Sequence, residues 1–234
     1  MRGNSTFAVN RNIQERIMGR KAGSFFFGFL NKVADLIILS LVFVATCIPV
    51  VTIGTAGTAL YYTVNKVVRR DHGYLLKEYF RSFKENFKQT FPIWLVFLAI
   101  LLVNATGMFI LNEYRLLGFS FGNFFVLPGA IIILVTAYAI QIFSYIARFE
   151  GTTREVLKTA GTVGVLNLGK AAASTILLFA GIVAVVYVLP LFIIVPALVC
   201  LGINFMMESV YRKYMSAEDL EREEERDHEE DAKD

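Results

Sequence analysis

The sequence predicts an all-α fold: a polytopic transmembrane helical bundle of about six crossings in three hairpins, with both chain ends in the cytoplasm. Hydrophobic residues make up 56% of the 234 residues, which suits one membrane domain and leaves no room for a large soluble domain. Six apolar stretches are each near the length that spans about 30 Å of hydrocarbon. They are residues 33–49, 50–66, 91–112, 124–146, 171–189 and 191–207.

The basic residues orient this map. All but one of the 23 Lys and Arg residues fall on the same side, the exception being Arg115 in the short connection 113–123. Segments rich in Lys and Arg stay in the cytoplasm, so the map describes a multi-pass protein of the inner membrane. The net charge of +3 is small, and the basic residues cluster at helix ends. We therefore expect membrane lipid rather than nucleic acid as a partner.

Composition divides the chain into three regions. Residues 1–32 form a cytoplasmic or interfacial N-terminal segment with a short aromatic run at 25–30, and residues 33–208 form the transmembrane domain. Residues 209–234 form a charged cytoplasmic tail, either a solvated extension of the last helix or disordered. We expect no removable signal peptide, because the N-terminus lacks an early apolar core followed by a cleavage site.

The second stretch, 50–66, is weakly apolar and rich in Gly, Thr and Ala. A re-entrant loop is the alternative to a crossing, but it would export the seven basic residues between 66 and 88, so a crossing is favoured. Pro49 predicts a tight uncharged turn before it. Gly54 and Gly57 predict close packing against the first helix, and we expect the stretch to be buried in the bundle.

Two inside loops are predicted to contain amphipathic helices. In residues 74–90, five apolar side chains recur at i, i+3, i+4 and i+7, namely Leu76, Tyr79, Phe80, Phe83 and Phe87. Such a face packs on the bundle, on the lipid interface or on a partner. The second loop, 149–170, is predicted to be helical from 153 to about 160. Asn31, Asn86 and Asn167 each precede a crossing, where an Asn side chain can cap a helix N-terminus.

Enzyme motifs are weak. Residues Gly118 to Gly122 match the G-x-S-x-G pattern around Ser120, but that motif needs a strand-turn-helix in an α/β sheet and a nearby histidine. Both histidines, His72 and His228, are predicted on the opposite membrane face. We expect no enzyme activity, no catalytic or metal-binding residues and no cofactor.

Polar residues inside the apolar stretches are few. Cys47 and Cys200 lack ligand spacing and are predicted to be small core side chains. Asn104, Gln141 and Asn204 suit interhelical hydrogen bonds. If these three line one cavity, solute conduction is favoured; if they pair in a dry core, a scaffold role is favoured. Asp35 and Glu208 lie at inside ends, so no deep ionisable residue indicates a proton-driven pump.

The second inside loop contains Glu155 followed by Ala160 and Gly161. This is faintly similar to the Glu-Ala-Ala…Gly coupling loop by which permease subunits of binding-protein-dependent ABC importers dock on their ATPase. Val156 and Leu157 stand in place of the two alanines. The alternative is that Glu155 is part of the solvated face of an amphipathic helix.

The chain resembles the YesL family of bacterial integral membrane proteins, whose biochemical function is unknown. Five segments carry the resemblance: residues 32–39, 48–54, 58–62, 81–89 and 94–95. It implies the bacterial cytoplasmic membrane and a setting of carbohydrate uptake beside sugar ABC transporters. It assigns no active residue.

These observations lead to a hypothesis about function. We expect a non-enzymatic accessory or scaffold protein of a sugar ABC transport system. Whether it forms a homo-oligomer is left open. The competing hypothesis is a solute-conducting bundle, either a divergent permease subunit or a passive channel. The candidate partner-binding residues are Lys77, Arg81, Lys84, Glu155, Lys158 and Gly161. The candidate structural residues are Asp35, Pro49, Gly54, Gly57 and Asn86.

Overall fold

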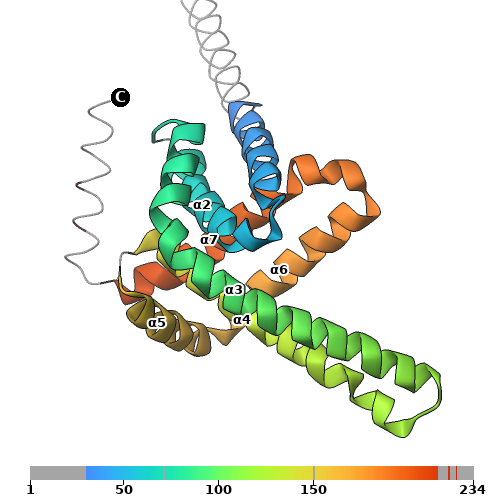
Figure 1. Cartoon of the computed structure of the whole chain (residues 1–234). Helices are drawn as coiled ribbons and strands as arrows, with labels where there is room; N and C mark the ends of the chain where they lie inside the picture. Colours follow the sequence, from blue (N-terminus) through green and yellow to red (C-terminus); the bar gives the residue numbers. More distant parts are fainter. Residues whose placement is uncertain (1–29, 71, 150, 216–220, 222–224, 226–234) are drawn as a thin grey trace, which may run out of the picture.

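The computed structural model describes residues 30–70, 72–149, 151–215, 221 and 225, and every element within this part of the chain is helical (Figure 1). This confirms the all-α prediction. The first described element is the helix Leu30–Cys47, drawn in blue. The further elements are η1 (Val50–Thr52), α2 (Ile53–Thr63), η2 (Val64–Arg69), α3 (Leu75–Leu116), η3 (Ser120–Phe125), α4 (Val126–Arg148), α5 (Thr153–Leu166), α6 (Leu168–Tyr187), η4 (Leu189–Ile193) and α7 (Val195–Tyr214). The predicted aromatic run at 25–30 and the tail lie mostly outside the described residues.

Four helical segments are long and apolar enough to cross a membrane, which points to a membrane protein. They are Leu30–Cys47, Leu75–Leu116, Asn123–Arg148 and Leu168–Tyr187. The other two predicted crossings correspond to α2, which has only 11 residues, and to α7, which carries Asn204, Glu208 and a basic last turn. The number of crossings therefore stays a prediction.

Helix α3 joins two segments that the sequence analysis had separated, the amphipathic helix 74–90 and the crossing 91–112. Its 42 residues correspond to about 63 Å at 1.5 Å per residue. Pro92 lies inside it and removes one N–H donor without ending the helix. Helix α2 and the turn before it bond α3 on both sides of the proline. Thr55 Oγ1 lies 2.7 Å from Thr90 Oγ1, and Trp94 Nε1 donates to the Val50 carbonyl at 2.8 Å.

The core is built around α2, where eight of the eleven residues are buried. One hydrophobic cluster joins α2 to the first helix and to α7, with Leu39, Val64 and Met207 among its fully buried side chains. A second cluster lies between α3, α4 and α5, around Ile142 and Val156. The prediction that the second apolar stretch is buried in the bundle is confirmed.

The small residues of α2 have different surroundings. A Cβ atom at Gly54 would lie 2.6 Å from Trp94 Cβ and 2.8 Å from Phe143 Cζ, so this glycine lets α3 and α4 approach. A close approach does occur at Gly54, but its partners are α3 and α4 and not the first helix that the sequence analysis predicted. At Gly57 a Cβ would meet no atom within 4 Å, and the same prediction is wrong there.

The turn at Pro49 is as tight as predicted. The first helix ends at Cys47, and Ile48 and Pro49 form a bend before η1. The Thr52 hydroxyl closes the turn, with Oγ1 lying 2.6 Å from the Thr46 carbonyl and 2.7 Å from the Pro49 carbonyl.

The far halves of α3 and α4 run side by side away from the other helices (Figure 1). The last buried residue of α3 is Phe97 and the first of α4 is Ala139. Between them, every described side chain is exposed or half-buried, including large apolar ones such as Val103, Phe109 and Leu134. An apolar surface of this extent suits contact with lipid.

Candidate functional site

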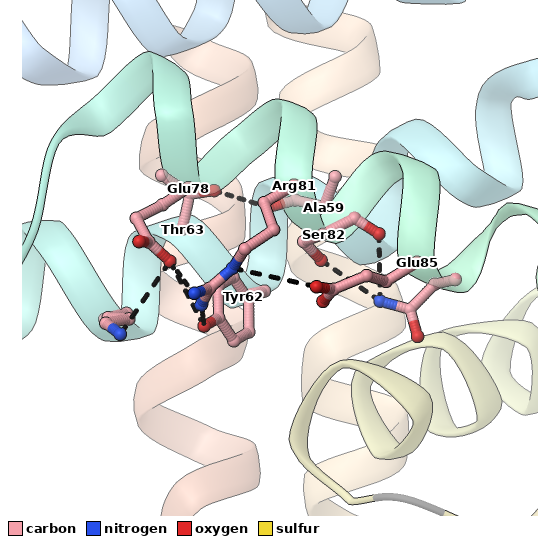
Figure 2. A network of polar contacts seen from close by, with 9 residues as sticks. Ala59, Tyr62, Thr63, Glu78, Arg81, Ser82 and Glu85 are labelled. Atoms are coloured by element: carbon pink, nitrogen blue, oxygen red, sulfur yellow. Dashed lines mark hydrogen bonds and ion pairs between the residues drawn. The ribbon is translucent and has the colours of Figure 1, made fainter.

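Two carboxylates are buried at the predicted cytoplasmic end of the bundle, and the first is Glu78 on α3 (Figure 2). Its side chain is 7% exposed, and its Oε2 lies 2.6 Å from Arg81 Nη2 and 3.8 Å from Lys66 Nζ. The Tyr62 hydroxyl lies 3.2 Å from the same oxygen. Arg81 also donates to Tyr62 and lies 4.0 Å from Glu85. The first turns of α3 are thereby attached to α2 and η2.

This network affects the predicted partner-binding residues. The Arg81 side chain is 42% exposed, but its guanidinium bonds Glu78 and Tyr62 within the chain. Lys77 and Lys84 are exposed on the same helix. Of the three basic residues predicted on this face, Arg81 has a structural role and the two lysines are accessible.

Aromatic side chains form a ladder along the same helix. The ring centroids of Tyr79 and Phe83 are 6.4 Å apart, and those of Phe83 and Phe87 are 5.9 Å apart. Tyr79 is fully buried, with its hydroxyl 2.7 Å from Thr46 Oγ1. Leu76 and Phe80, predicted on the same face, are 47% and 46% exposed. The amphipathic face therefore packs on the bundle through its central aromatic residues.

The second buried carboxylate is Glu208 on α7, which is 2% exposed. Its Oε1 lies 3.3 Å from Arg148 Nε, and Asn65 Nδ2 donates to the same atom at 3.2 Å. Arg69 donates to Asn65 Oδ1 at 3.2 Å and to Asn204 Oδ1 at 2.5 Å. Residues of η2, α4 and α7 thus meet in one polar cluster. The sequence analysis placed Glu208 at a helix end and missed this cluster, although the spacing of four between 65 and 69 and between 204 and 208 puts each pair on one helix face.

The π-helix η2 connects the two carboxylates. Lys66 contacts Glu78 on α3, whereas Asn65 and Arg69 reach Glu208 and Asn204 on α7. π-Helical turns are rare in proteins, and those that do occur are often found at functional sites. This segment is the strongest candidate for a functional element in the described chain.

Helix α5 carries the remaining predicted partner residues. Thr152 and Glu155 form a capping box: the Thr152 N–H donates to Glu155 Oε2 at 3.0 Å, and the Glu155 N–H donates to Thr152 Oγ1 at 3.4 Å. The first of these hydrogen bonds lowers the pKa of the Glu155 carboxyl. Lys158 is exposed, and a Cβ at Gly161 would lie 3.3 Å from the Tyr138 ring on α4. Glu155 and Gly161 therefore have structural roles, and Lys158 is accessible.

The prediction that the side chains of Asn86 and Asn167 cap helix N-termini is wrong. Asn86 lies in the middle of α3, where its Nδ2 donates to the Ser82 carbonyl at 3.0 Å. Asn167 makes no side-chain cap for α6, and its Nδ2 donates to the Val163 carbonyl at 3.0 Å and to the Tyr214 hydroxyl at 3.2 Å.

The three predicted deep polar residues lie in different surroundings. Asn104 donates to the Ile100 carbonyl of its own helix at 2.8 Å, and Asn204 accepts from Arg69. Gln141 is 3% exposed, and its Cγ is close to Gly164 on α5. Asn104 and Asn204 thus bond different partners. These bonds form neither the shared cavity nor the mutual pairing that the sequence analysis considered.

Other predicted residues are placed as follows. Cys200 is buried, Cys47 is half-buried and both are free thiols, while Asp35 is half-buried on the first helix. Gly118, with φ of +89°, follows α3, and Ser120 begins η3. The G-x-S-x-G pattern therefore connects two helices instead of a strand and a helix.

A comparison with protein families finds a match over part of the chain. Residues 36–108 match the family described as "Protein of unknown function, DUF624". No curated protein and no solved structure is significantly similar to the chain. The matched region includes the Pro49 turn, the buried helix α2, the π-helix η2 and the Glu78 network. Over these residues the chain is similar to a family whose function is unknown.

Proposed function

We propose that this chain is a non-enzymatic accessory or scaffold protein of the bacterial cytoplasmic membrane, linked to carbohydrate uptake by a sugar ABC transport system. Four apolar helices support the membrane location, and the DUF624 match agrees with the resemblance to YesL-like proteins. The sugar-transport setting rests on that resemblance alone.

The observation that carries the scaffold role is the way in which the two inside segments are fixed to each other. Gln89 Nε2 on α3 donates to the Gly151 carbonyl before α5 at 3.0 Å. Helix α5 is attached to α4, because the Tyr138 hydroxyl donates to the Leu157 carbonyl at 2.8 Å. The start of α3 is held by the Glu78 network. Ordered helices with exposed charges suit recognition of a folded partner, since binding then orders few side chains.

Exposed lysines are the residues to perturb. We expect the double variant Lys77→Glu and Lys84→Glu to lose co-purifying importer subunits when the tagged protein is isolated from its native membrane and analysed by mass spectrometry. Arg81 is left unchanged because it bonds Glu78. Lys213→Glu, another exposed lysine at the predicted inside end, is the matched control. A wild-type protein that purifies without any transporter subunit would contradict the proposal.

The buried cluster around Glu208 gives a specific reason to keep solute conduction as a second candidate. Ionisable side chains inside a membrane bundle often mark a solute pathway. Uptake of labelled sugars into proteoliposomes tests it directly. Flux that disappears in Asn204→Leu would support conduction, and proteoliposomes no more permeable than empty liposomes would exclude it for the sugars tested.

A further inference from the structure

The hydrogen-bond partners of Arg69 in the described structure are neutral. Its guanidinium donates to the amide oxygens of Asn65 and Asn204, and it lies 4.6 Å from the centroid of the Phe205 ring. Glu208 attracts Arg69 electrostatically, whereas Arg70 and Arg212 repel it. The Glu208 carboxylate is shared, since its Oε1 also lies 3.3 Å from Arg148 Nε. One carboxylate shared between two guanidinium groups leaves part of the Arg69 charge uncompensated, and hydrogen bonds to amides compensate only in part.

Three further polar atoms in the same part of the bundle are buried and have no hydrogen-bond partner among the described residues. They are the Asn204 Nδ2, the Tyr61 hydroxyl and Glu208 Oε2. Tyr61 lies within electrostatic range of both Arg69 and Glu208. Buried polar groups are nearly always satisfied, so this combination indicates a missing polar ligand. Two of the three atoms are donors, which favours an anion.

We propose that Arg69, the Asn204 amide and the Tyr61 hydroxyl bind a phosphate group at the cytoplasmic end of the bundle. The planar guanidinium fork matches two phosphate oxygens, and the amide and phenol supply further donors. Glu208 Oε2 then accepts from a hydroxyl of the same ligand. Two sources carry this chemistry: an inner-leaflet lipid with a hydroxylated headgroup, such as phosphatidylglycerol, or a soluble phosphate.

Thermal unfolding of the full-length protein in detergent, with ligand titration, tests the site and distinguishes the sources. Short-chain phosphatidylglycerol, short-chain phosphatidylcholine and inorganic phosphate are added separately. A lipid site predicts stabilisation by phosphatidylglycerol alone, and a soluble-phosphate site predicts stabilisation by inorganic phosphate as well. Stabilisation by none of them, or by phosphatidylcholine equally, would overturn the proposal.

Arg69→Gln is expected to weaken the response about tenfold or more, since a hydrogen bond to a charged group is lost. The matched control is Arg154→Gln, which removes the same charge from an exposed position on α5. A response equal to wild type in Arg69→Gln would refute the site.

A second variant covers the case in which Arg69→Gln does not fold. Asn204→Asp places a carboxylate where the Asn204 oxygen already accepts from Arg69. The internal anion should raise the unfolding temperature without ligand and abolish the ligand-dependent shift. A variant with an unchanged ligand-dependent shift would show that phosphate does not bind here.

Discussion

Replacement of Gly54 by alanine tests whether α2 is held between α3 and α4. The added Cβ would lie 2.6 Å from Trp94 Cβ, an atom fixed directly to the α3 backbone, and 2.8 Å from Phe143 Cζ. Overpacking of this kind costs about 1–3 kcal/mol, and the rigid neighbour places this site at the upper end. The higher helix propensity of alanine returns about 1 kcal/mol. We expect Gly54→Ala to lose about 2 kcal/mol of unfolding free energy.

Gly57→Ala is the matched control on the same helix. Its Cβ would meet no atom within 4 Å, so the propensity gain of about 1 kcal/mol should remain. Unfolding can be followed by titration with a denaturing detergent in mixed micelles, using the fluorescence of Trp94, the single tryptophan. The reasoning is refuted if Gly54→Ala is as stable as Gly57→Ala.

Two further predictions concern the predicted inside face. Glu78→Gln should lose about 1–3 kcal/mol of unfolding free energy in the same assay, because it leaves the Arg81 guanidinium without its closest carboxylate. The control Glu85→Gln, at a side chain that is 65% exposed, should change stability by less than about 0.5 kcal/mol. Equal effects of the two variants would contradict the buried network. Thr152→Ala should remove about 1 kcal/mol from the start of α5 and speed amide exchange in its first turn only. The capping box also contains a titrating bond, from the Thr152 backbone N–H to the Glu155 carboxylate, which lowers the pKa of Glu155. The stabilisation from this second bond is present above the ordinary pKa of a glutamate and is lost as the pH falls through the lowered value. Exchange in the first turn should therefore show extra protection at neutral pH that disappears in acid, and protection that is independent of this titration would contradict the assignment.

Local patterns predicted the helical class and the Pro49 turn, and four of the six predicted crossings correspond to apolar helices long enough to span a membrane, because hydropathy and proline act over a few residues. The burial of α2 also followed from its composition, since a weakly apolar segment with many small residues gains more from protein contact than from lipid. The continuity of α3 did not follow. Charged residues up to Lys88 suggested a boundary, and Asn86 was assigned to a cap that the unbroken helix does not need.

The two polar clusters were beyond prediction from this single sequence. Asn65, Arg148 and Glu208 are separated by 83 and then 60 residues, and they meet only after η2, α4 and α7 have packed. The positive-inside rule assigned such charges to one membrane face but could not show which of them pair. Arg81 illustrates the same limit. Its charge suggested a partner-binding surface, whereas in the folded chain its guanidinium pairs with Glu78.

Membrane sidedness is the central claim, because the partner surface and the phosphate site both need their residues in the cytoplasm. Single cysteines introduced as Ile48→Cys, Arg115→Cys, Lys77→Cys and Lys158→Cys, in a background without the two native cysteines, can be labelled with an impermeant maleimide in intact cells. Ile48 is a sensitive reporter of the turn before α2, since its side chain is 79% exposed. We predict labelling at 48 and 115 in intact cells, and at 77 and 158 only after the membrane is permeabilised. Labelling of 77 or 158 from outside, or of 48 only from inside, would contradict the account.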